Sequence, residues 1–153
     1  MSLRTAAHEV TVTQRQRTLK VPATEAARAA AAAAGYAKLR RGAISIVIVG
    51  DRKMRELNRR FAGYAGTTDV LAFDLSSGGA RDAVIGEVIV NSGLAAAEAA
   101  KRRGRALDEL LLYIVHGVLH LGGYRDKTDA QKKKMRAAER AVLSALGRRA
   151  QDR

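Results

Sequence analysis

The sequence contains no cysteine and no tryptophan, and proline occurs only once. Without cysteine there is no disulfide, no thiolate nucleophile and no Cys-ligated zinc, so any metal ion must be held by histidine and carboxylate side chains. Aromatic residues make up only 4% of the sequence. That scarcity argues against a surface that stacks bases, as single-strand-binding proteins have, so a nucleic acid would be bound mainly through its phosphates.

Long apolar runs are absent as well. No segment approaches the roughly 18 to 20 uninterrupted apolar residues that cross a bilayer, and the opening MSLRTAAHEV has no apolar signal-peptide core. We therefore expect a cytoplasmic protein that has no membrane contact. A length of 153 residues indicates one domain, which we place at 1–147, with a disordered tail at 148–153.

Acidic residues are few relative to basic ones. The sequence has 28 Lys and Arg against 15 Asp and Glu, a formal net charge of +13. Such an excess attracts polyanions, and nucleic acid is the first to consider. Charge alone is equally compatible with a solvated basic surface in an Arg- and Ala-rich chain. The stretches KRRGR (101–105) and KKKMR (132–136) are the candidates for phosphate contacts.

Hydrophobic periodicity predicts four strands and five helices, and therefore an α+β fold. A continuous β-branched run at 43–49 is typical of a central strand buried on both faces. We expect Asp51 to cap the helix that follows this strand, and Thr128 with Gln131 to form a capping box. A Ser-Gly loop is expected at 76–79. The predicted strands are 8–14, 43–49, 69–75 and 84–90, the last two as a hairpin, and the helices are 22–36, 51–61, 94–103, 108–121 and 127–146.

The motif with the most chemical content is IVHGVLHLGGYRD, residues 114–126. His116 and His120 are four residues apart, which on a helix places both imidazoles on one face about 40° apart, close enough to share a metal ion. A Gly-Gly pair then ends the helix, so the chain can fold back and bring the carboxylate of Asp126 onto the same ion. Three such ligands leave room for water and substrate.

Two histidines on an apolar helix can also be buried and hydrogen-bonded without any metal. Imidazoles in the middle of a Leu-, Ile- and Val-rich helix cost stability unless they have polar partners, and a shared ion with Asp126 would supply one for both. In HExxH metalloproteases the residue after the first His is a general base. Gly117 occupies that position, so a protease is not expected and the nucleophile would be a metal-bound water. Close approach of another element or of the substrate would explain this glycine, although it can equally be incidental.

Three segments, taken in order, resemble the YbeY family of bacterial, metal-dependent endoribonucleases. HGVLHLGGY (116–124), followed by a helix that carries Met135 and Glu139, is similar to the family's HGxLHLxGYxH and trailing MxxxE. LNRRFAGYAGTTDVLAF (57–73) resembles LNxxYRxxDxPTxVLSF, and IGEVIVN (85–91) resembles a strand LGDIxI. The resemblance extends from about Leu57 to Leu146.

What this resemblance implies is a small mixed sheet flanked by helices, a zinc ion on the HxxxH helix, and cleavage of single-stranded RNA near the ends of ribosomal RNA. Ribosomal RNA or the ribosome is then the expected partner. One divalent metal, zinc, is the expected cofactor.

The chain also departs from the family pattern. Asp126 stands in place of the third His, an anionic ligand that still suits zinc but also other divalent ions. Ala62 stands where the family has an Arg thought to face the substrate phosphate. Arg125 and Arg60 are the candidates to replace that positive charge, and Glu87 is a possible partner that orients a ligand imidazole.

Two other functions stay open at this point. The first is a non-catalytic RNA- or ribosome-binding protein that keeps the fold and the metal while the change at Ala62 weakens activity. The second is an iron oxygenase, because two His and one carboxylate are also a known ligand set for Fe(II). Nothing else in the sequence indicates a cosubstrate site for an oxygenase.

Overall fold

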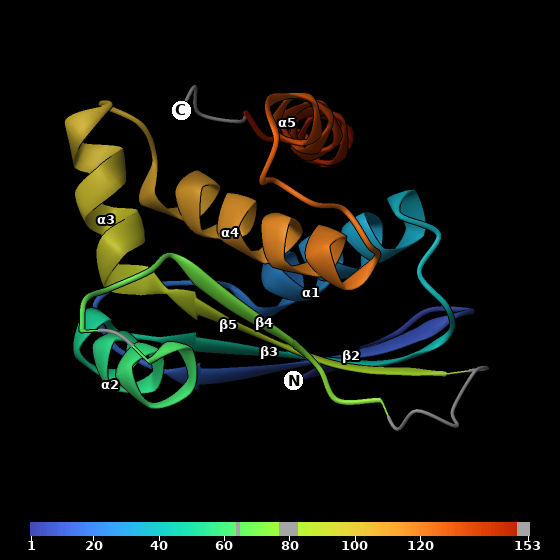
Figure 1. The fold of residues 1–153 in the computed structure, drawn as a ribbon, viewed down its shortest axis with the longest axis horizontal. Coiled ribbons are helices and arrows are strands. Elements are labelled where there is room, and N and C mark those ends of the chain that lie inside the picture. Colours follow the sequence, from blue (N-terminus) through green and yellow to red (C-terminus); the bar gives the residue numbers. More distant parts are fainter. Residues whose placement is uncertain (64, 77–82, 150–153) are drawn as a thin grey trace.

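The computed structural model describes residues 1–63, 65–76 and 83–149. In these residues five strands and five helices form the α+β fold expected from the sequence (Figure 1). The strands are β1 (Ser2–Arg4), β2 (His8–Arg15), β3 (Gly42–Val49), β4 (Val70–Asp74) and β5 (Val84–Asn91), and the helices are α1 (Ala23–Tyr36), α2 (Asp51–Ala62), α3 (Ser92–Lys101), α4 (Ala106–Leu121) and α5 (Asp129–Ala145).

The strands form one mixed sheet in the order β1-β2-β3-β5-β4. β2, β3 and β5 run parallel in the middle, and β1 and β4 pair antiparallel at the two edges. The expected pairing of β4 with β5 is therefore confirmed, but the expected number of four strands is wrong. β1 was missed because it is only three residues long and contains a single apolar side chain, Leu3, so it has no alternation to detect.

Helices cover the two faces of the sheet unequally. α1 and α4 pack on one face, where Ile44, Ile46 and Ile48 of β3 join the main core, and α5 lies outside α4 (Figure 1). α2 covers the other face, where Met54 packs in a smaller cluster with Val49 and Ile89. In the part of the chain that is described, no helix has both the length and the apolar character needed to cross a bilayer.

α4 is the helix at the centre of the molecule. Twelve consecutive residues from Asp108 to Leu119 are buried, because the sheet, α1, α3 and α5 all contact this helix. Gly117 faces the sheet. A Cβ atom there would lie 2.5 Å from Cγ1 of Val88 and 2.9 Å from Cγ2 of Val70. The close approach of another element thus accounts for this glycine.

Asp51 does not cap α2 as expected. The N-cap is Gly50, and no side chain caps this helix end. Instead the Asp51 carboxylate accepts hydrogen bonds from the Thr67 hydroxyl (2.5 Å) and the Asn91 amide (2.8 Å). These hydrogen bonds lower the pKa of Asp51 to about 2, and the bond from Thr67 has the largest effect. The contacts tie the start of α2 to the segment before β4 and to the end of β5.

The other predicted features near the chain ends have mixed outcomes. The capping box of Thr128 and Gln131 at α5 is confirmed. Arg148, placed in the expected tail, is held by ion pairs with Glu25 and Asp108. Residues 150–153 lie outside the described residues, as do 77–79 of the expected loop, so those expectations stay predictions.

Candidate metal centre

The two histidines of α4 lie side by side at one end of the helix. Their Nε2 atoms are 2.9 Å apart, and the ring centroids are separated by 4.5 Å with the planes nearly perpendicular, at 78°. His116 is buried, whereas the side chain of His120 is 31% exposed. The helical spacing has therefore placed both imidazoles on one face, as the sequence predicted.

The end of α4 turns the chain back toward these rings. Gly122 is the C-cap, and Gly123 has a φ of +94°, in the left-handed region that glycine adopts without steric cost. The N–H of Gly123 bonds to the carbonyl of His120 and the N–H of Tyr124 to that of Leu119, both at 3.0 Å. This is the Schellman ending of a helix, and it reverses the chain before residue 126.

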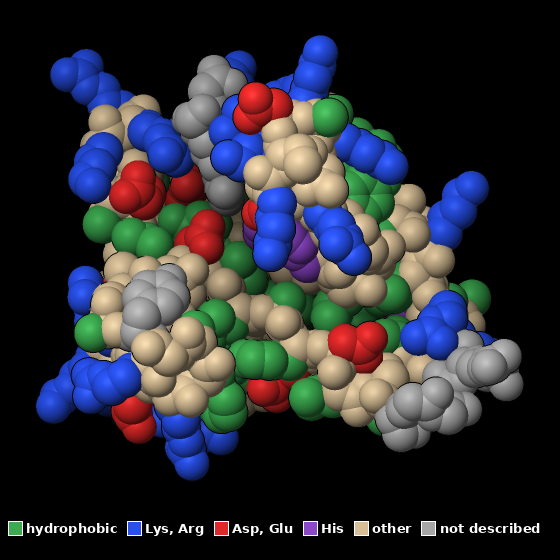
Figure 2. All heavy atoms as spheres, viewed as in Figure 1, with side chains coloured by type: hydrophobic (Ala, Val, Ile, Leu, Met, Phe, Trp, Pro, Cys, Tyr) green, Lys and Arg blue, Asp and Glu red, His purple; other side chains and the backbone are tan. Residues whose placement is uncertain are grey.

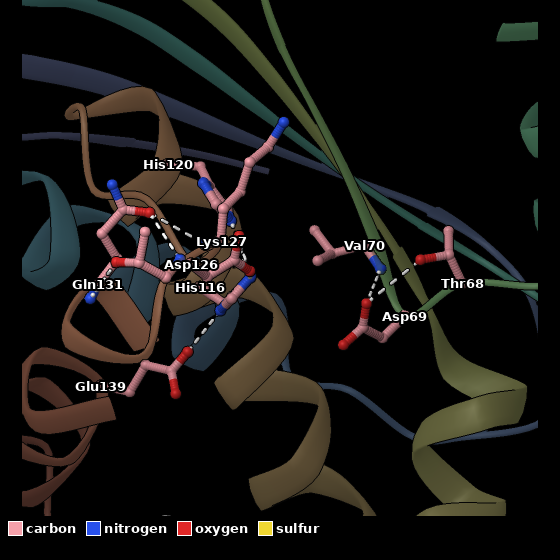
Figure 3. A network of polar contacts seen from close by, with 10 residues as sticks. Thr68, Asp69, Val70, His116, His120, Asp126, Lys127, Gln131 and Glu139 are labelled. Atoms are coloured by element: carbon pink, nitrogen blue, oxygen red, sulfur yellow. Dashed lines mark hydrogen bonds and ion pairs between the residues drawn. The ribbon is translucent and has the colours of Figure 1, made fainter. Parts of the chain in front are cut away.

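Asp126 comes back over the two histidines as a result. Its Oδ2 atom lies 3.3 Å from Nε2 of His116 and 3.4 Å from Nε2 of His120. One donor atom from each of the three side chains lies within 4.8 Å of the others. The three residues proposed from the sequence as metal ligands are thus brought together (Figure 3).

Glu139 of α5 holds the far side of the His116 ring. Its Oε2 atom is 2.5 Å from Nδ1 of His116, and Glu139 is only 3% exposed. Glu139 therefore orients the His116 ring, whereas Glu87 has no hydrogen bond or ion pair with either imidazole among the described residues. A sequence signal did exist, because Glu139 stands among Met135, Ala138 and Val142 on the core-facing side of α5.

This donor set fits a divalent cation. A carboxylate at Nδ1 keeps the proton on that nitrogen, so Nε2 of His116 presents a lone pair toward His120 and the Asp126 carboxylate. Lone pairs and negative charge that converge in a partly buried place are unfavourable unless a proton or a cation lies between them. His ligands with an outer carboxylate partner are the arrangement found around zinc in proteins.

A cavity of about 190 Å³ opens beside His116 and Asp126. Met135 and Glu139 form part of its wall, and the basic side chains of Lys132 and Arg136 complete it. Figure 2 shows histidine at the bottom of a hollow in the surface, between Lys and Arg side chains. The centre is therefore accessible from solvent on the side that α5 lines.

The two arginines that the sequence offered as phosphate-binding candidates do not line this cavity. Arg125 lines a separate hollow of about 270 Å³ together with Lys134. Arg60 lies on α2, the helix that covers the other face of the sheet, with its guanidinium 5.7 Å from the ring centroid of Phe61. Ala62 is exposed at the end of the same helix. The positive groups beside the centre come instead from α5.

Comparison with known proteins gives one consistent result. A family model described as Endoribonuclease YbeY matches residues 5–147. Relatives with that name include proteins of Anaeromyxobacter sp. (38% identical over 104 residues, 68% of this chain and 54% of the relative), Thermodesulfovibrio yellowstonii (36% over 105 residues, 67% and 66%) and Pelotomaculum thermopropionicum (36% over 129 residues, 80% and 83%).

The matched part therefore spans about half of the Anaeromyxobacter protein and just under two thirds of the Thermodesulfovibrio protein. A protein of Thermotoga maritima, solved in solution, is similar in structure with a TM-score of 0.60. The match covers 90% of this chain and 91% of that one at 20% sequence identity. This last likeness concerns the fold.

Proposed function

The chain belongs to the endoribonuclease YbeY family, and from this premise we propose that it is a metal-dependent endoribonuclease that cuts single-stranded RNA during ribosomal RNA maturation. His116, His120 and Asp126 hold one divalent ion, and the two imidazoles favour zinc. The protein acts in the cytoplasm, where that RNA is made and processed in bacteria.

The observation that carries the proposal is the open side of the three-ligand cluster. A structural zinc site is closed by four protein ligands, whereas a catalytic site has three and leaves a position for water and substrate. Here three donor atoms converge, and the cavity of about 190 Å³ lies next to two of them. That arrangement favours catalysis over a purely structural ion.

The contacts of Glu139 and Asp126 support a separate role for each in the proposed reaction. Glu139 holds the Nδ1 proton of His116 and so keeps Nε2 free to bind. Asp126 contributes negative charge, which favours a cation at this place. When bound, the ion supplies Lewis acidity for the hydrolysis of a phosphodiester. With Gly117 at the position of the HExxH base, the ring of ligands contains no protease-type general base.

The alternative functions have less support. A non-catalytic RNA-binding protein would not need an open position beside the ligands. An iron oxygenase is not favoured either, because residues 5–147 match an endoribonuclease family.

The first prediction tests the metal and the reaction together. His116→Ala should reduce the metal content of protein purified without added ions from about one ion per chain toward none, and should abolish cleavage of single-stranded RNA. Elemental analysis and single-turnover cleavage, each with and without a chelator, are the measurements.

His8 supplies the matched control for that experiment. Its Nε2 atom lies 2.9 Å and 3.1 Å from the carbonyl oxygens of Arg40 and Leu39, away from the cluster. His8→Gln should therefore retain the metal. A metal-free parent protein with an intact fold would overturn the metal site, and cleavage that persists in chelator would overturn the proposed mechanism.

A further inference from the structure

Basic side chains of α5 line two hollows on the surface near the candidate metal centre. A second hollow, of about 570 Å³, is lined by Lys132 and Arg136 again, together with Lys133, Arg140 and Asp129. Because Lys132 and Arg136 line both hollows, the two hollows are neighbours on α5, and we call them together the basic path.

Helical geometry explains why these side chains lie there. Lys132 and Arg136 are four residues apart, so they share one face of α5. That face adjoins the one carrying Met135 and Glu139, which are buried against α4. A side chain at 132 or 136 must therefore emerge at the border between the core and solvent, next to the ligands.

The basic side chains along this path are not engaged in polar contacts within the protein. Among the described residues, no ion pair or hydrogen bond is formed by the side chains of Lys132, Lys133, Arg136 and Arg140. Other arginines do have partners: Arg102 pairs with Glu98 and Glu109, and Arg55 with Asp51. Asp129 is the single acidic residue lining the outer hollow, against four Lys and Arg residues, so this hollow carries a net positive charge.

The remaining basic groups near the turn after α4 lie in a different place. Lys134 has its ammonium 5.2 Å from the ring centroid of Tyr124, and it lines a hollow with Arg125 that contains none of the three ligands. The two basic side chains that line the cavity beside His116 and Asp126 therefore both come from one face of α5.

From this geometry we propose that Lys132 and Arg136 form a phosphate subsite. They bind the backbone phosphate next to the one at the metal centre, and Lys133 and Arg140 guide the same RNA strand outward. An arginine and a lysine suit this task, since a guanidinium can bind two phosphate oxygens and an ammonium adds a point charge. The inference rests on the proposed function for the identity of the ligand, a single-stranded RNA.

The test compares two double variants with the same change in charge. Lys132→Gln with Arg136→Gln removes the subsite. The control is Arg15→Gln with Arg17→Gln. Arg15 is exposed at the end of β2 and Arg17 is exposed two residues later, and neither residue lines either hollow. The full-length metal-loaded protein is titrated with a short fluorescent 2′-O-methyl RNA at several salt concentrations, and a gel checks that this probe stays intact. Single-turnover cleavage of unmodified RNA is measured alongside.

We expect the subsite variant to bind about 10- to 100-fold more weakly than the control variant at low salt. Its slope of log affinity against log salt should be shallower by about 0.7 for each phosphate that the protein no longer neutralises. Metal content should be unchanged, and Arg136→Lys should recover part of the affinity. Equal affinity and equal slope in the two double variants would overturn the subsite. If the subsite variant binds RNA more weakly by the expected factor but the parent does not cut RNA, the proposed reaction is overturned and the subsite is supported.

Discussion

At the scale of single residues, His116 lies between two carboxylates that have different tasks. Asp126 faces its Nε2 atom at 3.3 Å and is 41% exposed, whereas Glu139 faces its Nδ1 atom at 2.5 Å and is almost fully buried. The exposed carboxylate is available to a ligand, and the buried one is not. The buried contact with Glu139 therefore fixes the orientation of the His116 ring.

The second prediction concerns Glu139. Glu139→Gln retains the shape and a hydrogen-bond acceptor but removes the negative charge that favours a cation and fixes the tautomer of His116. We expect metal affinity to fall about 10- to 100-fold, measured by competition with a coloured chelator. Glu87→Gln is the control, and an equal decrease in both variants would show that Glu139 has no special role.

The third prediction concerns Asp126. Asp126→His should retain or tighten zinc binding, because it restores the third imidazole of the family pattern and imidazole suits zinc. Asp126→Ala should weaken binding. If metal content in the alanine variant equals that of the parent, Asp126 is not a ligand and the two histidines hold the ion without it.

The sequence predicted residues whose position follows from local geometry. His116, His120 and Asp126 lie within one helix and the turn after it, so their spacing was informative. The role of Glu139 depends on how α5 packs across α4, 23 residues later, and local spacing cannot reveal that. The same limit explains why Arg60 and Arg125 were considered for a place that Lys132 and Arg136 occupy.

At the scale of elements, the contact of α4 with the sheet positions His116 and His120 of the candidate metal centre. Gly117 lies between the two histidines in sequence and faces the sheet, where a Cβ atom would meet Val88 of β5 and Val70 of β4. The absence of a side chain lets the helix approach β4 and β5 closely. Figure 3 shows the start of β4 facing the ligand cluster.

The fourth prediction tests this contact. Gly117→Ala gains helix propensity of about 1 kcal/mol, but overpacking against Val88 and Val70 costs about 1–3 kcal/mol and displaces the ligands. We expect a net loss of stability, measured by urea unfolding, together with weaker metal binding. Gly35→Ala in α1 should instead stabilise by roughly 0.5–1 kcal/mol, because a Cβ atom there meets nothing within 4 Å.

A rescue variant separates packing from other effects. Val88→Ala combined with Gly117→Ala makes room for the added methyl group, so the double variant should lose less stability than the sum of the two single variants. Simple additivity would show that the contact with Val88 is not the reason for the destabilisation.

Each strand and helix expected from the sequence is present within about two residues of its expected bounds, and one short strand was missed. α1, α4 and α5 begin and end within about two residues of the expected bounds. β1 was not predicted because a strand of three residues is too short to show an alternation of apolar and polar side chains. Asp51 was predicted to cap α2, but Thr67 and Asn91 compete for its carboxylate, and the fold brings them there from 16 and 40 residues away.

At the scale of the whole molecule, the net charge is +13, and the basic stretches differ in how far they are already paired with acidic residues. The stretch at 101–105 lies against acidic residues, since Lys101 and Arg102 both pair with Glu98 and Arg102 also pairs with Glu109. The stretch at 132–136 contributes to the basic path along α5. Of the two basic stretches that the sequence indicated, the second is therefore the stronger candidate for RNA.

The fifth prediction concerns the pH dependence of folding. Hydrogen bonds from Thr67 and Asn91 lower the pKa of Asp51 to about 2 from an ordinary 3.8, so the ionised carboxylate favours the folded state. Its contribution is complete above about pH 4 and disappears as the pH falls toward 2. Asp51→Asn should therefore differ most from the parent above pH 4 in urea unfolding, and the two should converge toward pH 2.

Thr67→Val provides a second measurement of the same linkage. It removes the hydroxyl donor with little change of shape, so it should raise the pKa of Asp51 and move the loss of stability to higher pH. Parallel stability curves for the parent, Asp51→Asn and Thr67→Val between pH 4 and 2 would contradict the assignment.

The position of Glu139 also sets an order in time. Protein synthesis proceeds from the N-terminus and structure forms as the chain emerges, so both histidines and Asp126 are made before α5 exists. A nascent chain that has reached α4 lacks the carboxylate that orients His116 and the lysine and arginine that accompany it. The contact that orients the His116 ring therefore forms only after α5 has been made and has packed on α4.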